Sequence, residues 1–134
     1  MNNPGIYTLF AGEITTALTD EASEAIIDLD GMNAVTIVAK LAYGSSGTSI
    51  AAKIQTSFDG GTTWVDAARL DFTTSSATKY VNLSGLTAKG ATAYSALGSE
   101  GVNDGLLGDR LRCLLTTVGT YAGSTTLDIR ASVR

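Results

Sequence analysis

Apolar and polar residues alternate along most of this chain, in short runs that predict β-strands. Every second residue is apolar from Val35 to Leu41, and the same period of two returns from Leu111 to Leu115 and from Leu127 to Val133. Strand signals recur roughly every 10 to 15 residues, and no sustained helical stripe interrupts them. The pattern predicts an all-β protein of about eight strands in two packed antiparallel sheets, a β-sandwich with jelly-roll or immunoglobulin-like connections.

The clearest hairpin is centred on the octet SFDGGTTW, Ser57 to Trp64, which separates two strand-like runs. Asp59, Gly60 and Gly61 provide the positive-φ positions and the side-chain acceptor that a tight turn needs. The octet fits the Asp-box pattern Ser-x-Asp-x-Gly-x-Thr-Trp of sialidase propellers, where the box is a structural turn. The chain carries the box once and is too short for a propeller. We therefore predict a structural hairpin formed by Ser57, Asp59, Gly60, Gly61, Thr63 and Trp64.

The 134 residues predict a single domain, preceded by an N-terminal arm at about residues 1–12. After Pro4 the arm is apolar and needs a surface, either the protein's own core or a neighbouring subunit. Ser23 to Leu29 alternates and predicts a further strand. Leu86 to Asn103 breaks the alternation, and a loop of that length in a compact domain is commonly functional or ordered by a partner. We predict partner contacts in the arm and the loop, at Ile6, Tyr7, Leu9, Phe10, Tyr94 and Leu97.

Charge narrows the range of partners. The net charge is −4 and no segment concentrates lysine or arginine, so the electrostatic signature of a nucleic-acid-binding protein is missing. No apolar run reaches the roughly 18 residues that a membrane span requires, and the N-terminus lacks the pattern of a secretory signal. Only 16% of residues are charged, against about 25% in an average soluble domain. The low value favours a surface that is partly covered by copies of the chain or by another protein.

Candidate catalytic chemistry is sparse. The chain has no histidine, which removes the usual general base and the common zinc sites. Cys113 is the single cysteine and lies in an alternating run, so we expect a buried, inert thiol. The spacing of Asp28, Asp30, Asp104 and Asp109 does not match a calcium loop. Nothing places two acids together as a glycosidase pair; the glutamates available for one are Glu13, Glu21, Glu24 and Glu100. The sequence therefore predicts no catalytic residue, no metal, no cofactor and no enzyme.

One binding alternative stays open at this stage. Trp64, with Tyr80, Tyr94 or Tyr121 beside it, would form a platform on which sugars stack. In the competing interpretation, Trp64 covers the hairpin turn, as it does in other Asp boxes.

Two stretches carry a resemblance to a known group of proteins. Gln55 to Asp66, and Leu107 to Arg112 followed by Leu127 to Arg130, resemble segments of small β-sandwich virion proteins of tailed bacteriophages. The resemblance implies a head decoration (cement) protein, made in the host cytoplasm and located on the head surface. It also implies binding to the major capsid protein and to copies of itself, for example as a trimer, with no catalytic residues. A tail, neck or fibre module is the alternative within the virion.

Overall fold

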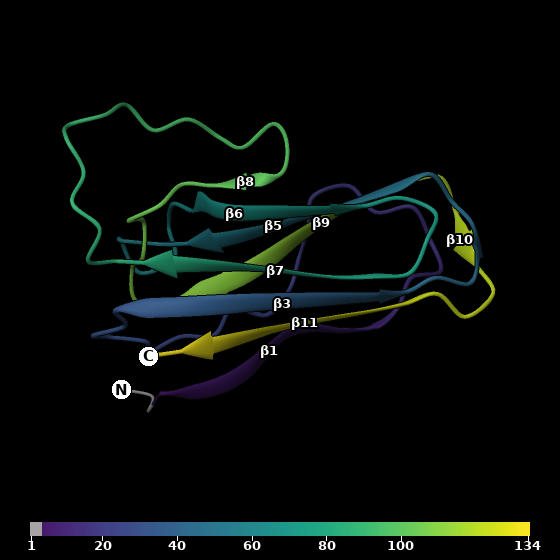
Figure 1. The fold of residues 1–134 in the computed structure, drawn as a ribbon, viewed down its shortest axis with the longest axis horizontal. Coiled ribbons are helices and arrows are strands. Elements are labelled where there is room, and N and C mark those ends of the chain that lie inside the picture. Colours follow the sequence, from purple (N-terminus) through teal and green to yellow (C-terminus); the bar gives the residue numbers. More distant parts are fainter. Residues whose placement is uncertain (1–3) are drawn as a thin grey trace.

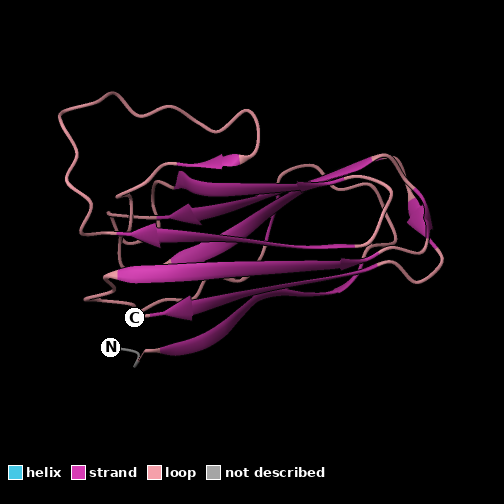
Figure 2. Ribbon diagram, in the orientation of Figure 1, coloured by secondary structure: helices cyan, strands magenta, loops and turns pink. Residues whose placement is uncertain are grey.

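The computed structural model describes residues 4–134, so the first three residues of the predicted arm lie outside the described part of the chain. No helix occurs in residues 4–134, and none could therefore span a membrane (Figure 2). The strands are β1 (Gly5–Glu13), β2 (Glu21–Ala22), β3 (Ala34–Ala42), β4 (Ser45–Ser46), β5 (Ser49–Thr56), β6 (Val65–Phe72), β7 (Ala77–Ser84), β8 (Gly101–Val102), β9 (Leu111–Val118), β10 (Tyr121–Ala122) and β11 (Thr126–Val133) (Figure 1).

The strands form two large antiparallel sheets and one small ribbon. The first sheet has the order β1-β11-β3-β7, the second has the order β2-β9-β5-β6-β8, and β10 pairs with β4. With β1, β2, β3, β5, β6, β7, β9 and β11 numbered 1 to 8 in chain order, the sheets read 1-8-3-6 and 2-7-4-5. This is the strand order of a jelly roll. The predicted all-β sandwich is confirmed, and its connections are of the jelly-roll type.

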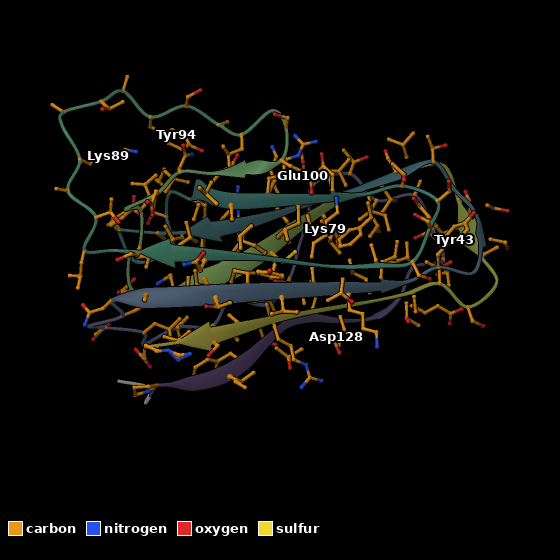
Figure 3. All side chains as sticks on the ribbon, in the orientation of Figure 1. Tyr43, Lys79, Lys89, Tyr94, Glu100 and Asp128 are labelled. Atoms are coloured by element: carbon orange, nitrogen blue, oxygen red, sulfur yellow. The ribbon has the colours of Figure 1, made fainter. Side chains whose placement is uncertain are left out.

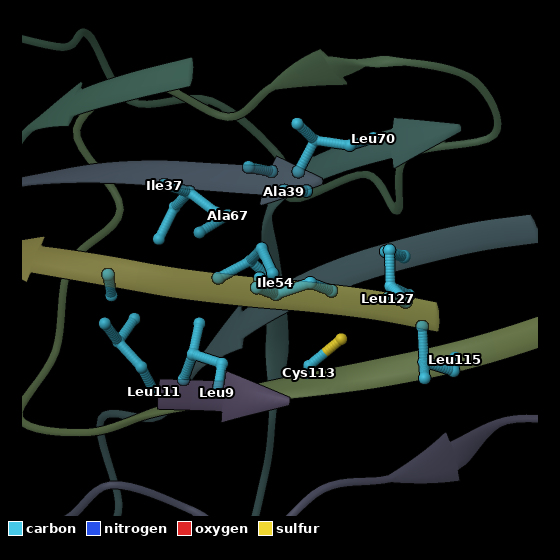
Figure 4. Packing of buried hydrophobic residues seen from close by; sticks show 14 of the residues in the cluster. Leu9, Ile37, Ala39, Ile54, Ala67, Leu70, Leu111, Cys113, Leu115 and Leu127 are labelled. Carbon is cyan, nitrogen blue, oxygen red and sulfur yellow. The ribbon is translucent and has the colours of Figure 1, made fainter. Parts of the chain in front are cut away.

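The core lies between the two sheets and is formed by the inward side of each alternating strand (Figure 4). Along β3, residues 35, 37, 39 and 41 are buried; along β9, residues 111, 113, 115 and 117 are buried. Because successive side chains of a strand point to opposite faces, the apolar period of two places one side of each strand in this layer. The largest fully buried side chains are Tyr121, Ile14, Leu29, Ile37, Leu41, Ile50, Ile54, Leu70, Leu83, Leu111, Leu115 and Leu127.

The predicted strand from Ser23 to Leu29 is wrong. In this region only Glu21–Ala22 forms a ladder with β9, and Ile26 adds one isolated bridge to Leu111. Ile27, which the alternation assigns to the buried side, is 47% exposed. Asp28 adopts a φ of 59°, a left-handed conformation that ends any regular strand. The segment instead runs along the edge of β9 as irregular chain.

Candidate functional site

The SFDGGTTW octet connects β5 to β6, and its polar groups are used within the turn. Gly60 and Gly61 have φ values of 76° and 90°, which glycine adopts without steric cost. The Ser57 hydroxyl donates to Asp59 Oδ1 at 2.9 Å and accepts from the Gly61 amide at 2.9 Å. The Thr63 amide donates to Asp59 Oδ1 at 2.8 Å. These bonds close the hairpin.

The environment of Asp59 keeps this carboxyl group ionised. Hydrogen bonds from the side chain and the amide of Thr63 are the main reason why the pKa of Asp59 falls to about 2. At neutral pH the group is therefore a permanent acceptor that holds the turn. It has no proton to give to a substrate.

Trp64 covers the turn. Its Nε1–H group donates to the Gly61 carbonyl oxygen at 3.0 Å, and the guanidinium of Arg112 lies 4.4 Å from the ring centroid. A guanidinium at this distance over an aromatic face is a cation–π contact. Because Arg112 occupies that face of the ring, the face is closed to a stacked sugar.

Two of the three tyrosines predicted as partners of Trp64 lie elsewhere, while the Tyr94 hydroxyl accepts from the amide of Asp66, two residues after Trp64. Tyr121 is buried at the β10 end of the sandwich, where its ring meets that of Tyr43 edge-on at 6.1 Å between centroids. Tyr80 is 75% exposed on the first sheet, opposite Val38 of β3. Neither joins Trp64, which belongs to the hairpin of the second sheet. A sugar platform made of Trp64 with these two tyrosines is not formed.

The two stretches that carry the phage resemblance pack directly against each other. The Thr56 hydroxyl donates to the Arg110 carbonyl oxygen and accepts from the Gly108 amide, both at 2.8 Å. Arg110 in turn donates from Nη1 to the Gly60 carbonyl oxygen at 3.0 Å. A Cβ atom on Gly108 would collide with the carbonyl oxygen of Ser57, so only glycine fits there. The hairpin and residues 107–112 therefore form one rigid unit.

The long loop between β7 and β8 is attached to the second sheet through Asp66, which is only 2% exposed. The Asp66 carboxylate accepts from Gln55 Nε2 at 2.8 Å and from the Leu97 amide at 3.0 Å. The Asp66 amide donates to the Tyr94 hydroxyl at 2.8 Å, and Asn103 Nδ2 donates to the Asp66 carbonyl oxygen at 2.8 Å. Tyr94 and Leu97 thus anchor the loop through polar atoms.

A second attachment lies near Glu100 (Figure 3). The Glu100 carboxylate accepts from the Asp71 amide at 2.9 Å and from Lys79 Nζ at 2.8 Å. These two bonds, the Asp71 amide first, lower the pKa of Glu100. Arg69 Nη1 donates to the Leu97 carbonyl oxygen at 3.1 Å. The loop is therefore fixed along residues 94–103. Residues 85–96 are all exposed, and residues 85–93 extend away from the sandwich (Figure 1).

Residues of this loop and of the segment after β8 line a half-open hollow of about 300 Å³ with both polar and apolar walls. Hydroxyl, amide, carboxylate and ammonium groups all contribute to its wall. The polar lining residues include Lys89, Thr92, Tyr94, Ser95, Asn103 and Asp104. Tyr94, Asn103 and Asp104 already make hydrogen bonds within the protein.

The described part of the predicted arm is strand β1, which pairs with β11 and lies on the protein's own core. Leu9 is only 3% exposed, because its side chain belongs to this core, and it is therefore removed from the candidate partner contacts. Tyr7 and Phe10 are partly buried against the same core. Ile6 is 71% exposed and is the arm residue that presents most of its side chain outward.

Two of the candidate acidic residues make local structural contacts. Asp104 accepts from the Gly105 amide at 3.1 Å, and Asp109 forms an ion pair with Arg110 at 3.1 Å. Within residues 4–134, no group of three or more His, Cys, Asp or Glu side chains comes together as a metal site would require. Burial raises the pKa of the Cys113 thiol to about 12, so the nucleophilic thiolate is not formed at neutral pH.

Fold and site together define a class: a jelly-roll sandwich with a hydrogen-bonded hairpin and a projecting loop. Searches of protein-family models, of curated proteins and of solved structures find no match to the chain. The function of the chain is therefore inferred from its own surfaces.

Proposed function

We propose that the chain is a structural protein of a tailed-bacteriophage virion, a decoration (cement) protein on the outer surface of the head. It binds the major capsid protein and stabilises contacts between capsomers, without a cofactor. The resemblance of Gln55 to Asp66 and of Leu107 to Arg112 supports this proposal. The jelly-roll architecture is compatible with it, because viral capsid and lectin domains share that architecture. A fold does not determine a function, so the proposal depends on the surface that would bind.

The observation that carries the proposal is the exposed but anchored loop. Leu86 is 76% exposed and Tyr94 is 50% exposed, in a segment whose following residues are fixed to β6 by Asp66, Asp71 and Arg69. Tyr94, whose hydroxyl is bonded to the Asp66 amide, loses less conformational entropy on binding than a side chain of an unattached loop. We therefore assign the capsid contact to residues 85–96.

Repetition over a shell explains how so small a contact would suffice. A protein of 13.8 kDa offers one modest interface per copy. When many copies bridge neighbouring capsomers, each bridge becomes effectively intramolecular once one end is bound. The summed effect resists the separation of capsomers without any catalytic step.

Capsids that lack the protein provide the test. Wild-type protein is expected to bind them, and Leu86→Ser is expected to weaken binding about tenfold or more, because a buried leucine contributes about 1.5–3 kcal/mol. Val118→Ser is the matched control: Val118 is also exposed, at 53%, but it lies at the end of β9 that leads to β10. Absence of wild-type binding would exclude the decoration role. Equal losses in both variants would exclude the loop as the contact.

Location within the particle separates the head from the tail, neck and fibre alternatives. Cryo-electron microscopy or immunogold labelling of virions is expected to place the protein on the head surface. Deletion of residues 1–12 is not a suitable test, because it would remove β1 and take Leu9 out of the core.

Glycan binding is a second candidate, favoured by the hollow under the loop, where the Tyr94 side chain lies among hydroxyl and amide groups. The test is a glycan array with wild type, Tyr94→Ala and Tyr80→Ala. Tyr94 lines the cavity, whereas Tyr80 is an exposed tyrosine on the other sheet. A sugar that binds wild type and Tyr80→Ala but not Tyr94→Ala would support this candidate, and an empty array would dismiss it.

A further inference from the structure

The two large sheets differ in how the polar side chains of their outer faces are used. On the second sheet, Gln55, Asp66 and Arg112 bond one another or the loop that follows β7. On the outer face of the first sheet, most polar side chains are exposed or half-buried and make no hydrogen bond or ion pair within residues 4–134. They are Thr8, Thr36, Lys40, Thr78, Tyr80, Asn82 and Ser132. Donors and acceptors without a protein partner are available to a ligand.

Three strands of the first sheet, β7, β3 and β11, place part of this set in two neighbouring rows (Figure 1). In one row Tyr80 stands opposite Val38, and Val38 stands opposite Arg130. In the next row Lys40 stands opposite Asp128. Directly opposite side chains on antiparallel strands are about 4.5–5.5 Å apart at Cβ, and diagonal ones about 7–8 Å. One small ligand can therefore contact both rows.

Tyr80 gives this face an aromatic surface. It is 75% exposed, and Val38 beside it is 40% exposed. Val38 also lines an open hollow of about 220 Å³ together with Lys40, Asp128 and Arg130. A sugar ring has apolar C–H groups on its faces and hydroxyl groups around its rim, so an aromatic side chain bordered by polar groups complements it.

The charged side chains of the two rows are not fully used within the protein. Arg130 donates from Nε and Nη2 to the two carboxylate oxygens of Asp128, at 3.0 and 3.3 Å, which fixes the pair and leaves Arg130 Nη1 without a partner in residues 4–134. Lys40 forms no ion pair in the same range. The rows thus hold two cations and one anion, on a protein whose net charge is −4.

We propose that the outer face of the first sheet binds an acidic glycan, with a sugar ring stacked on Tyr80 and a sugar carboxylate at Lys40. The carboxylate supplies the counter-ion that Lys40 lacks in the protein. Tyr80 and Lys40 are diagonal neighbours, so a single sugar and its substituent span the distance between them. This site lies apart from the proposed capsid contact at residues 85–96.

A protein partner is less well matched to this face. The central part of a protein interface is apolar and poor in charge. The two rows instead alternate Tyr80 and Val38 with Lys40, Asp128 and Arg130, and free hydroxyl and amide groups surround them. Hydroxyl-rich ligands satisfy such groups one by one.

An array of sialylated and uronic-acid glycans, each beside its neutral counterpart, tests the purified protein without capsids. Wild type is expected to bind an acidic glycan more tightly than the neutral counterpart, and less tightly as salt is raised. Calorimetry with that acidic glycan is expected to show about tenfold weaker binding for Tyr80→Ala. For Lys40→Gln we expect a two- to fivefold loss, about the effect of one exposed ion pair.

Two matched controls make the same changes elsewhere. Phe58→Ala removes an aromatic side chain that is 61% exposed on the hairpin, and Lys89→Gln removes an exposed lysine of the loop. Both controls are expected to bind as wild type does. All four substituted side chains are exposed, so each variant is expected to fold, which circular dichroism checks.

Loss of affinity in Tyr80→Ala and Lys40→Gln, with both controls unchanged, supports the site. It is excluded if no acidic glycan binds, if neutral counterparts bind as tightly, or if Lys89→Gln loses as much affinity as Lys40→Gln. If Tyr80→Ala is unfolded, NMR shifts of wild type with the acidic glycan decide instead: shifts centred on β3, β7 and β11 support the site, and shifts centred on residues 85–96 exclude it. Because no capsid is present, failure here leaves the decoration proposal standing.

Discussion

Thr56→Val tests whether the hairpin and residues 107–112 are held together as the structure indicates. Thr56 is fully buried. Its hydroxyl donates to the Arg110 carbonyl oxygen and accepts from the Gly108 amide, each at 2.8 Å. Valine has the same shape, so no cavity forms, but both backbone groups lose their partner. An unsatisfied buried group costs about 1–3 kcal/mol. Because Gly108 and Arg110 are half-buried, partial access of water brings our expectation to a total of about 2–3 kcal/mol.

Equilibrium unfolding in urea measures this loss. Fluorescence of Trp64, the single tryptophan, reports on the hairpin, and circular dichroism reports on the sheets. The control is Thr78→Val, at an exposed position of β7, which is expected to stay within about 0.5 kcal/mol of wild type. If Thr56→Val also stays within that range, or if both variants lose the same amount, the hydroxyl bridge does not hold the unit together.

Three further results are expected. The Asp59 carboxyl should titrate near pH 2 by NMR, and at a higher pH in Thr63→Ala, which removes the side-chain hydrogen bond and keeps the amide one. Because the folded pKa of Asp59 is lowered, its stabilising effect is present above pH 3.8 and is lost as the pH falls toward 2. Trypsin should cut the native loop first at Lys89, and faster in Tyr94→Phe, which leaves the Asp66 amide without its acceptor. Cys113 should resist thiol reagents until the protein unfolds.

The parts of the fold that follow from short-range pattern could be predicted from the sequence. The hairpin from Ser57 to Trp64 is local. Its turn glycines, the acceptor Asp59 and the Trp64 ring that covers the turn are contained in eight consecutive residues. The alternation of β3, β9 and β11 likewise places their core faces without knowledge of their partners. The alternation from Ser23 to Leu29 predicts a strand that does not form, because alternation does not reveal whether a segment has hydrogen-bonding partners along its length.

The attachments of the loop could not be predicted. Asp66 bonds residues 28, 31 and 37 positions away, and Lys79 bonds Glu100 across 21 positions. No local pattern brings these residues together, since the pairing depends on where the loop returns to β6. The missed residues left one weak signal: Lys79 and Asp66 are charged residues within or beside strands whose neighbours are mostly apolar. A charge in such a place needs a partner, but the sequence does not say which.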